Sequence, residues 1–404
     1  MNDTPLSNRM HIGIFGRRNA GKSTLINSIT GQDIAIVSDI PGTTTDPVYK
    51  AMEIHDIGAV VVIDTGGIDD SGKIGEMRVK KAYKILNKTD IALLVIDRSQ
   101  ALGEHELNFI KEVNARGVPL IAVINKIDQG NVAGGLLSEL QLKKINYICV
   151  SALKNEGIGE LRKRIVGLAP DDYERKSILK DILAPRDLVL MVAPLDMEAP
   201  KGRLKLPQVQ TIRDVLDTDC QVLVVKEPEL EDALNNLQNP PKLVITESQV
   251  LSSVAKFIPQ NIALTTFSVL YARYKGDLDI LVDGARQIDN LKAGSRVLIA
   301  EACTHHPIGD DIGRVVIPGY LNSKSKGIII EHVAGYDFPS NLNGYSLIIH
   351  CGGCMLNRRE MLSRIGYASA FHTPITNYGI FLAHMHDMLE RVVAAFGQEK
   401  CVSL

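Results

Sequence analysis

One segment near the start of the chain has the spacing of a phosphate-binding loop. Residues 16–23 read GRRNAGKS, which matches the pattern GxxxxGK[ST] and lies between a short apolar run and a helix-like stretch. Glycines in such a loop let successive backbone N–H groups point at phosphate oxygens, and the following helix N-terminus adds a favourable dipole. Lys22 would bridge the β- and γ-phosphates, and Ser23 would coordinate Mg²⁺. The residues predicted to contact nucleotide here are Gly16, Asn19, Ala20, Gly21, Lys22, Ser23 and Thr24.

Three later motifs indicate which nucleotide binds, and each follows a run of strand-forming residues. The first, DTGG, begins at Asp64, which can hold Mg²⁺ through water while the Gly67 N–H contacts the γ-phosphate. The second, NKID, ends at Asp128, whose carboxylate can accept both N–H groups on the guanine Watson–Crick edge, a pair that adenine lacks. The third, SAL, begins at Ser151 and would approach the guanine O6. The motifs predict GTP rather than ATP, with further contacts from Asp64, Gly67, Asn125, Lys126, Asp128, Ser151 and Ala152.

A second group of chemically active residues lies in the last quarter of the chain. The sequence CTH runs from Cys303 to His305, and HCGGC runs from His350 to Cys354. Both follow strand-like runs, and open α/β sheets place their ligands at the carboxyl ends of strands. The two glycines between the last cysteines would let the backbone turn tightly, so that both thiolates face one ion or cluster.

Three thiolates leave the identity of the bound metal open. With a histidine they suit tetrahedral zinc, and without one they suit a [4Fe–4S] cluster that keeps one iron for an exchangeable ligand. A reversible disulfide between Cys351 and Cys354 is a third interpretation. The other cysteines are predicted to have no such role: Cys149 and Cys220 as buried core thiols, and Cys401 as a residue near the terminus.

The elements that must position these residues read as α/β structure. Strand-like runs alternate with helix-length stretches through the first third of the chain, which predicts a mainly parallel sheet with helices on both faces. We predict an N-terminal P-loop GTPase domain (1–172), a small α/β dimerisation module (181–265) and a C-terminal α/β domain that carries the cysteines (266–404). The middle module is small for a core of its own, so we expect it to pair with another copy.

Two helices are expected outside these strands. The charged stretch 171–180 (DDYERKSILK) is predicted to be a linker helix. A single closing helix is predicted from apolar positions with a 3.6-residue period, namely Phe381, Met385, Met388, Leu389, Val392 and Phe396.

Length and composition set broad limits. The chain has 404 residues, which predicts two to three domains. Its net charge of −2, 5% aromatic content and lack of Trp argue against a nucleic-acid-binding platform. The apolar runs are too short to span a bilayer, and residues 1–10 lack the apolar region of a secretion signal. We therefore expect a cytoplasmic protein with reduced thiols and with neither nucleic acid nor membrane as partner.

Residues 9–168 resemble the GTPases of the TrmE–Era group. The segment 41–46 (PGTTTD) is similar to the switch I of that group, which implies Thr44 as a Mg²⁺ ligand. Ile68 stands where Ras-like enzymes have a water-orienting Gln. Asn19 matches the potassium ligand of the group, where K⁺ occupies the place of an arginine finger. The resemblance implies slow GTP hydrolysis stimulated by K⁺, with Lys22, Thr44, Gly67 and Asn19 as the catalytic set.

The whole chain resembles the HydF family of [FeFe]-hydrogenase maturation GTPases. The resemblance rests on a GTPase domain joined to CxH…HCxxC, with 195–217 (LDMEAPKGRLKLPQVQTIRDVLD) between them. It implies that the C-terminal domain binds a [4Fe–4S] cluster on Cys303, Cys351 and Cys354. It also implies a scaffold that carries a precursor of the two-iron subcluster of the hydrogenase. The implied partners are apo-hydrogenase, the radical-SAM maturases HydE and HydG, and a second copy of the chain.

Two questions stay open at this point. Candidates for the fourth cluster ligand are His350, His305 and Asp196. The competing interpretation of the whole chain is an Era-like GTPase that acts on RNA or the ribosome and carries a structural zinc domain.

Overall fold

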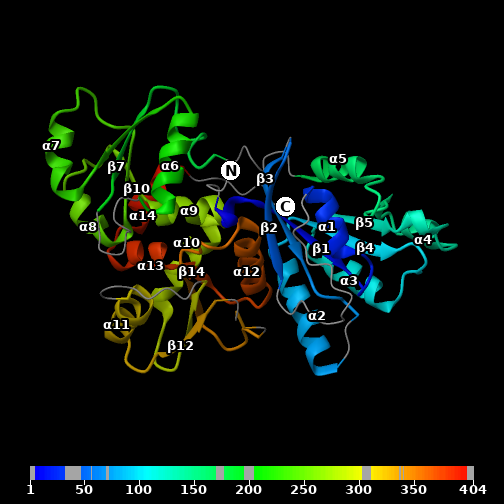
Figure 1. Cartoon of the computed structure of the whole chain (residues 1–404). Coiled ribbons are helices and arrows are strands. Elements are labelled where there is room, and N and C mark those ends of the chain that lie inside the picture. The colour runs from blue at the N-terminus through cyan, green and yellow to red at the C-terminus, as the bar shows by residue number, and fades with distance from the viewer. Residues whose placement is uncertain are drawn as a thin grey trace. The chain divides into compact units, whose positions relative to one another are not determined.

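The computed structural model describes residues 5–31, 47–55, 57–69, 72–169, 177–194, 204–302, 311–335, 338–339 and 341–397. The chain divides into two compact units, residues 1–175 and 176–404, whose helices and strands are labelled in Figure 1. Each unit has its own sheets and core, and each is described separately below.

The first unit is built on a six-stranded sheet with the order β2-β3-β1-β4-β5-β6. Strand β2 runs antiparallel to β3, and the other neighbours pair in parallel. The bounds of the strands are β1 Met10–Gly16, β2 Val48–Ile54, β3 Gly58–Asp64, β4 Ile91–Asp97, β5 Leu120–Asn125 and β6 Asn146–Cys149.

Helices cover both faces of this sheet, which is why its central strands read as continuous apolar runs. One face packs against α1 and α5 through Leu25 and Leu161. The other packs against α2, α3 and α4 through Leu86, Phe109 and Leu140. The bounds of the helices are α1 Lys22–Thr30, α2 Gly72–Leu86, α3 Glu104–Ala115, α4 Leu136–Leu142 and α5 Ile158–Leu168.

The second unit contains two four-stranded sheets, ordered β10-β9-β7-β8 and β12-β11-β13-β14. All strand pairs in both sheets are parallel. The bounds of the strands in the first sheet are β7 Leu188–Val192, β8 Gln221–Val225, β9 Leu243–Thr246 and β10 Ala263–Thr266. Those of the second sheet are β11 Arg296–Glu301, β12 Ile329–Ala334, β13 Leu347–His350 and β14 Ile375–Asn377.

One continuous core joins the two sheets of this unit. It includes Val244 of the first sheet, Ile348 of the second, and Val269 and Leu281 from the two helices α9 and α10. The bounds of the helices are α6 Leu206–Asp217, α7 Leu230–Asn235, α8 Leu251–Val254, α9 Phe267–Lys275, α10 Leu278–Arg286, α11 Ile317–Lys324, α12 Arg358–Ala370, α13 Tyr378–Met385 and α14 Leu389–Val393.

All the runs that the sequence predicts to be strands overlap one, but three further strands were not expected. The predicted runs are 12–15, 60–63, 91–96, 120–124, 147–150, 188–192, 222–225, 243–245, 297–300, 328–331 and 347–349. The unexpected ones are β2, β10 and β14. Strand β2 has exposed alternate positions at the edge of its sheet, and β14 has only three residues. Neither has the long buried apolar run from which the other strands are recognised.

The predicted linker helix is wrong in the part that the structure describes. From Ser177 onward the chain forms turns rather than helix. The carboxylate of Asp214 in α6 accepts hydrogen bonds from Ser177 Oγ at 2.9 Å, the Ile178 N–H at 3.0 Å and the Leu179 N–H at 2.9 Å. This distant carboxylate satisfies backbone donors that a helix would otherwise have to satisfy. Residues 171–176 lie outside the described part.

The single closing helix is also wrong, because the chain breaks it in two. Helix α13 ends at Met385 and α14 begins at Leu389. Asp387 between them has φ of 56°, a left-handed conformation that an α-helix does not contain. The apolar positions nevertheless face the core from both short helices, as Phe381 and Val392 do.

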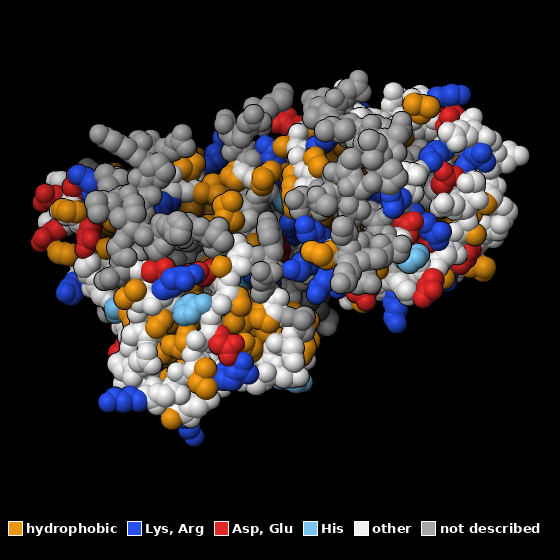
Figure 2. Space-filling model, turned by 60° about the horizontal axis from the view of Figure 1, so that its bottom comes forward, with side chains coloured by type: hydrophobic (Ala, Val, Ile, Leu, Met, Phe, Trp, Pro, Cys, Tyr) orange, Lys and Arg blue, Asp and Glu red, His pale blue; other side chains and the backbone are white. Residues whose placement is uncertain are grey.

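Charged side chains are spread over the surface of the described residues. In the view of Figure 2, basic and acidic side chains lie intermixed, and apolar side chains gather in several places between them. No helix among the described residues is long and apolar enough to cross a membrane.

Candidate functional site

The phosphate-binding loop joins β1 to α1 and depends on two glycines. Gly16 has φ of 146°, and a Cβ there would lie 2.3 Å from the Val95 carbonyl oxygen of the neighbouring strand. Gly21 has φ of 92° and precedes the first residue of α1. Both conformations favour glycine, so the glycines of the motif are explained by backbone shape as well as by close approach to phosphate.

The side chain of Lys22 folds back over this loop. Its Nζ donates to the carbonyl oxygens of Gly16 at 3.0 Å and Arg17 at 2.8 Å. The ammonium is therefore held above the backbone amides of the loop, which is the position that phosphate binding requires.

The two predicted Mg²⁺ ligands that the structure describes lie together. Ser23 Oγ donates to Asp64 Oδ2 at 2.9 Å, because β1 and β3 are neighbours in the sheet. Burial raises the pKa of the Asp64 carboxyl, and the Ser23 hydrogen bond and the positive charges of Lys22 and Lys50 oppose that rise. A hydroxyl beside a carboxylate suits the oxygen coordination that Mg²⁺ prefers. Thr44, the third predicted ligand, lies outside the described residues.

The guanine-recognition motifs are tied to the phosphate loop through Asn125. Its Nδ2 donates to the Ala20 carbonyl oxygen at 3.0 Å, and its Oδ1 accepts from the Ala152 N–H at 3.0 Å. Lys126 Nζ adds a hydrogen bond of 2.6 Å to the carbonyl oxygen of Asn19. Three segments far apart in the sequence are thus joined before any nucleotide binds.

The carboxylate that would recognise guanine is also oriented in advance. Ser151 Oγ donates to Asp128 Oδ1 at 2.7 Å, and this hydrogen bond lowers the pKa of the Asp128 carboxyl. Asp128 is therefore ionised at neutral pH, as it must be to accept two N–H groups of guanine.

Two ion pairs support the site and have no signal in the motifs. Arg17 in the loop binds the buried Glu106 of α3 with Nε–Oε1 at 2.5 Å and Nη2–Oε2 at 2.6 Å. Lys126 binds Asp97, at the end of β4, with 2.7 Å between Nζ and Oδ2. Burial opposes ionisation of Asp97, but hydrogen bonds from Lys126 and Ser99 outweigh it and lower the pKa to about 2. Asp97 could have been found as a polar residue at the end of a strand; Glu106 could not.

Two further residues predicted to contact nucleotide are described. Thr24 is in the first turn of α1, and Gly67 follows β3. Ile68 is 2% exposed, so the side chain at this position packs in the core and cannot orient an attacking water.

Cys351 and Cys354 follow β13, which pairs in parallel with its neighbour β11. Ala300 lies opposite His350 in register, and the Cys351 N–H donates to the Ala300 carbonyl oxygen at 2.8 Å. The Ala302 N–H in turn donates to Cys351 Sγ at 3.1 Å. Cys351 is buried and Cys354 is exposed. Cys303 and His305 follow β11 but lie outside the described residues, as does Asp196.

Of the two glycines in HCGGC, the backbone demands only the second. Gly353 has φ of 60°, and a Cβ there would lie 2.4 Å from Met361 Cε. A Cβ at Gly352 would meet nothing within 4 Å. The tight turn predicted between the cysteines is thus formed at Gly353.

His350 is fully buried, with both ring nitrogens occupied. Nε2 accepts from Arg364 Nη1 at 2.9 Å, so the proton is on Nδ1, which donates to the Cys351 carbonyl oxygen at 2.6 Å. Burial, assisted by the charge of Arg364, lowers the pKa of His350 to about 4. The imidazole would have to break one of these bonds to become the fourth cluster ligand. Within the described residues, no three potential metal ligands lie together.

The other cysteines differ in burial. Cys220 is buried, and its Sγ lies 3.0 Å from the Ala184 carbonyl oxygen. Cys149 is only partly buried, less than a core thiol would be, and burial raises its pKa. Cys401 lies outside the described residues.

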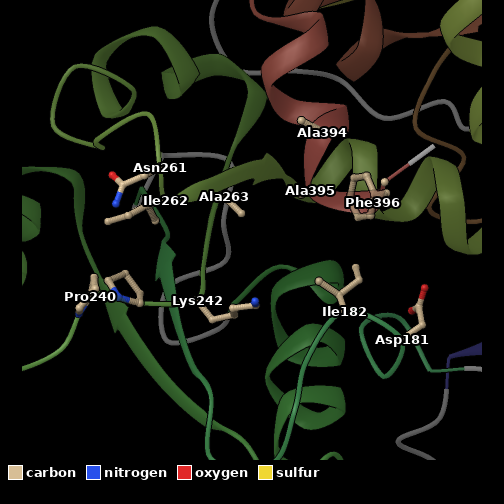
Figure 3. Close-up of a pocket in the computed structure, with 12 residues that line it drawn as sticks. Asp181, Ile182, Pro240, Lys242, Asn261, Ile262, Ala263, Ala394, Ala395 and Phe396 are labelled. Atoms are coloured by element: carbon tan, nitrogen blue, oxygen red, sulfur yellow. The ribbon is translucent and has the colours of Figure 1, made fainter. Parts of the chain in front are cut away.

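A pocket of 590 Å³ in the second unit lies away from all of these residues. Figure 3 shows Lys242 and Ala263, at the starts of β9 and β10, facing Ile182 and Phe396 across it. None of the predicted site residues lines this pocket.

Comparison with known protein families matches three parts of the chain in order. Residues 11–126 match a model described as 50S ribosome-binding GTPase, residues 178–276 match the hydrogen maturase F dimerization domain, and residues 279–395 match the hydrogen maturase F tetramerization domain. The chain belongs to the hydrogen maturase F (HydF) family. It therefore carries a GTPase domain followed by dimerisation and tetramerisation domains. Cys303, Cys351 and Cys354 fall within the match to the tetramerisation domain.

The GTPase domain is also similar to other GTPases. The chain is 35% identical to GTPase Era of Carboxydothermus hydrogenoformans over 167 residues, which cover 40% of this chain and 55% of that protein. It is 30% identical to GTPase Era of Alkaliphilus metalliredigens over 234 residues, which cover 54% and 78%. It is 37% identical to the tRNA modification GTPase MnmE of Pseudothermotoga lettingae over 178 residues, which cover 41% and 37%.

A solved structure of Era in complex with MgGDPNP and part of 16S ribosomal RNA gives a TM-score of 0.37 at 22% identity. It covers 54% of this chain and 91% of that chain. Among the curated relatives, the chain spans 55% of the length of Era from Carboxydothermus hydrogenoformans and 37% of the length of MnmE from Pseudothermotoga lettingae.

We expect Asn125→Ala to loosen the nucleotide site even without nucleotide. The substitution leaves the buried Ala20 carbonyl and Ala152 N–H without partners, which should cost about 2 to 4 kcal/mol of unfolding free energy. Denaturant unfolding and calorimetric GDP titration measure the two effects. The matched control is Asn131→Ala, at an exposed position of the same unit. Equal stability and GDP affinity in the two variants would contradict the bridging role.

We expect Gly353→Ala and Gly352→Ala to differ although they are adjacent. The first places a Cβ at a positive φ and against Met361, so it should cost about 1 to 2 kcal/mol or more. The second should stay within about 0.5 kcal/mol of the parent protein. Thermal unfolding of the two variants is the measurement. Equal unfolding temperatures for Gly353→Ala and Gly352→Ala would contradict the left-handed turn at Gly353.

Proposed function

We propose that this HydF-family chain is a GTP-hydrolysing scaffold of the cytoplasm that holds a [4Fe–4S] cluster and supports assembly of the two-iron subcluster of [FeFe]-hydrogenase. In this proposal it receives material from the radical-SAM maturases HydE and HydG and transfers the subcluster to apo-hydrogenase. The observation that supports the proposal is that Cys303, Cys351 and Cys354 fall within the sequence matched by a hydrogen maturase F domain, and that Cys351 directly follows β13, a parallel neighbour of β11.

The residues present fit a [4Fe–4S] cluster. Cys351 Sγ already accepts a backbone N–H, as cluster-ligating sulfurs commonly do, and exposed Cys354 follows after the turn at Gly353. Cys303 comes two residues after the end of β11, the strand next to β13. These three residues would hold the cluster. When bound, it would supply one iron with an exchangeable position, to which His350, His305 or Asp196 is proposed to bind until the two-iron cargo replaces it.

The GTPase domain would supply the nucleotide-dependent part of the cycle. Lys22 would contact the phosphates, Ser23, Asp64 and Thr44 would hold Mg²⁺, and Asp128 would select guanine. The remaining proposed contacts are Gly16, Asn19, Ala20, Gly21, Thr24, Gly67, Asn125, Lys126, Ser151 and Ala152.

Asn19 is free to bind potassium. It is exposed, and its side chain has no hydrogen-bond partner among the described residues, although its carbonyl oxygen accepts from Lys126. Since Ile68 cannot orient water, the acceleration of GTP hydrolysis requires another group, and a positive charge next to the phosphates would serve. K⁺ held by Asn19 would provide that charge.

The competing RNA-directed function has less support. It requires an RNA-binding domain with structural zinc after the GTPase domain, whereas that part of the chain matches two hydrogen maturase F domains. Its prediction of bound zinc is tested by the same experiment as the leading proposal.

We expect each of Cys303→Ala, Cys351→Ala and Cys354→Ala to lose most of the cluster. The test is anaerobic reconstitution with iron and sulfide, followed by iron content, absorption and EPR spectra. The matched control is Cys220→Ala, which removes a buried thiol of the same unit and should keep the cluster signal. Retention of zinc without a cluster signal by the parent protein would reject this proposal and favour the RNA-directed one.

We expect GTP hydrolysis in KCl to exceed that in NaCl of equal ionic strength by at least roughly tenfold. A preorganised group that stabilises transition-state charge is worth about 10²–10³ in rate. Asn19→Ala should remove the difference while leaving GDP affinity largely unchanged. Release of phosphate measured at saturating GTP gives both rates. Equal rates for the parent protein in the two salts would exclude the potassium proposal and leave the GTPase assignment intact.

A further inference from the structure

Lys275, the last residue of α9, is a buried cation without a carboxylate partner. It is 3% exposed, its Nζ lies 5.9 Å from the centroid of the Tyr271 ring, and no ion pair with an Asp or Glu is found for it among the described residues. Burying a charge without a counter-charge is costly, so buried lysines usually have a compensating group. Burial lowers the pKa of Lys275 to about 8, and Cys354 acts in the opposite direction.

The ammonium points at the loop that carries the last cysteines. Nζ donates to the carbonyl oxygens of Cys354 at 3.1 Å and Leu356 at 2.9 Å. A contact runs in the opposite direction between the same two segments, where Arg358 Nη1 donates to the Tyr274 carbonyl oxygen at 2.6 Å. The end of α9 and the start of α12 are therefore clamped together around this loop.

The contact also joins two family domains. Lys275 falls within the match to the dimerisation domain, and Cys354 and Leu356 fall within the match to the tetramerisation domain. The two carbonyl oxygens carry only partial negative charge. The loop they belong to would become strongly negative once its thiolates ligate iron, and that charge would balance the ammonium.

We infer that Lys275 is a positioning residue for the cluster, which fixes the loop from Cys351 to Leu356 and places a positive charge beside it. This inference rests on the proposed cluster at Cys303, Cys351 and Cys354. A fixed positive charge stabilises the reduced, more negative cluster over the oxidised one. Lys275 therefore raises the reduction potential, a quantity that depends on local charge and hydrogen bonding.

Two substitutions separate the charge of Lys275 from its hydrogen bonds. Lys275→Met removes both, whereas Lys275→Gln removes the charge but keeps an N–H donor. Lys275→Arg keeps the charge, and Lys256→Met is the matched control at an exposed lysine of the same unit. Circular dichroism establishes that each variant is folded.

The first measurement is an EPR-monitored redox titration of the reconstituted full-length protein. We expect Lys275→Met and Lys275→Gln to shift the midpoint to more negative potential, and Lys256→Met to leave it unchanged. A Lys275→Met protein with the parent iron content and the parent midpoint would overturn the tuning role. If that variant does not fold, Lys275→Gln gives the same decision.

The second measurement is hydrogen exchange on the apo protein, which needs no cluster. We expect faster exchange of the amides from Cys351 to Leu356 in Lys275→Met, with a smaller effect in Lys275→Gln and none in Lys256→Met. Unchanged exchange in Lys275→Met would overturn the positioning role. Absence of any cluster in the parent protein would instead count against the proposed function, and the exchange result would still decide whether Lys275 holds the loop.

Discussion

Parallel pairing of buried strands determines where each candidate functional residue of this chain lies. In a parallel sheet all carboxyl ends meet at one edge, and here the described candidate residues follow β1, β3, β5 and β6 in the first unit and β13 in the second. Register keeps the neighbours close: Ile14 lies opposite Asp64, and Ala300 opposite His350.

Preorganisation of the nucleotide site comes from contacts within the protein rather than from ligand. Asn125 links the phosphate loop to the segment at Ala152, and Lys126 reaches both Asn19 and Asp97. These contacts restrain three separate segments, so that less conformational freedom remains to be lost when nucleotide binds. The strained backbone of the loop is confined to glycines and Asn19, whose left-handed conformations are tolerable for those residue types.

The cysteine loop, residues 351–356, is organised by different contacts. A backbone N–H meets Cys351 Sγ, Gly353 makes the turn, and Lys275 holds the carbonyl oxygens that follow. His350, next to the first cysteine of the loop, is bonded inward to Arg364 and is part of the support. The loop therefore depends on α9, a helix of the matched dimerisation domain, which makes the geometry of the loop sensitive to the packing between the two matched domains.

Sequence alone determined the motif residues, their order and the strands that precede them, because apolar runs and glycine-containing turns are local signals. It missed the edge strand β2 and the short β14, where burial is partial or the run is brief. Tertiary structure decided the rest. Hydrogen bonds to the Asp214 carboxylate stabilise turns where a linker helix was predicted. The left-handed conformation of Asp387 separates α13 from α14, where a single closing helix was predicted. Glu106 and Lys275 lie 89 and 79 residues from the groups they hold, and no local pattern in a sequence can specify a pairing that exists only after the sheets have packed.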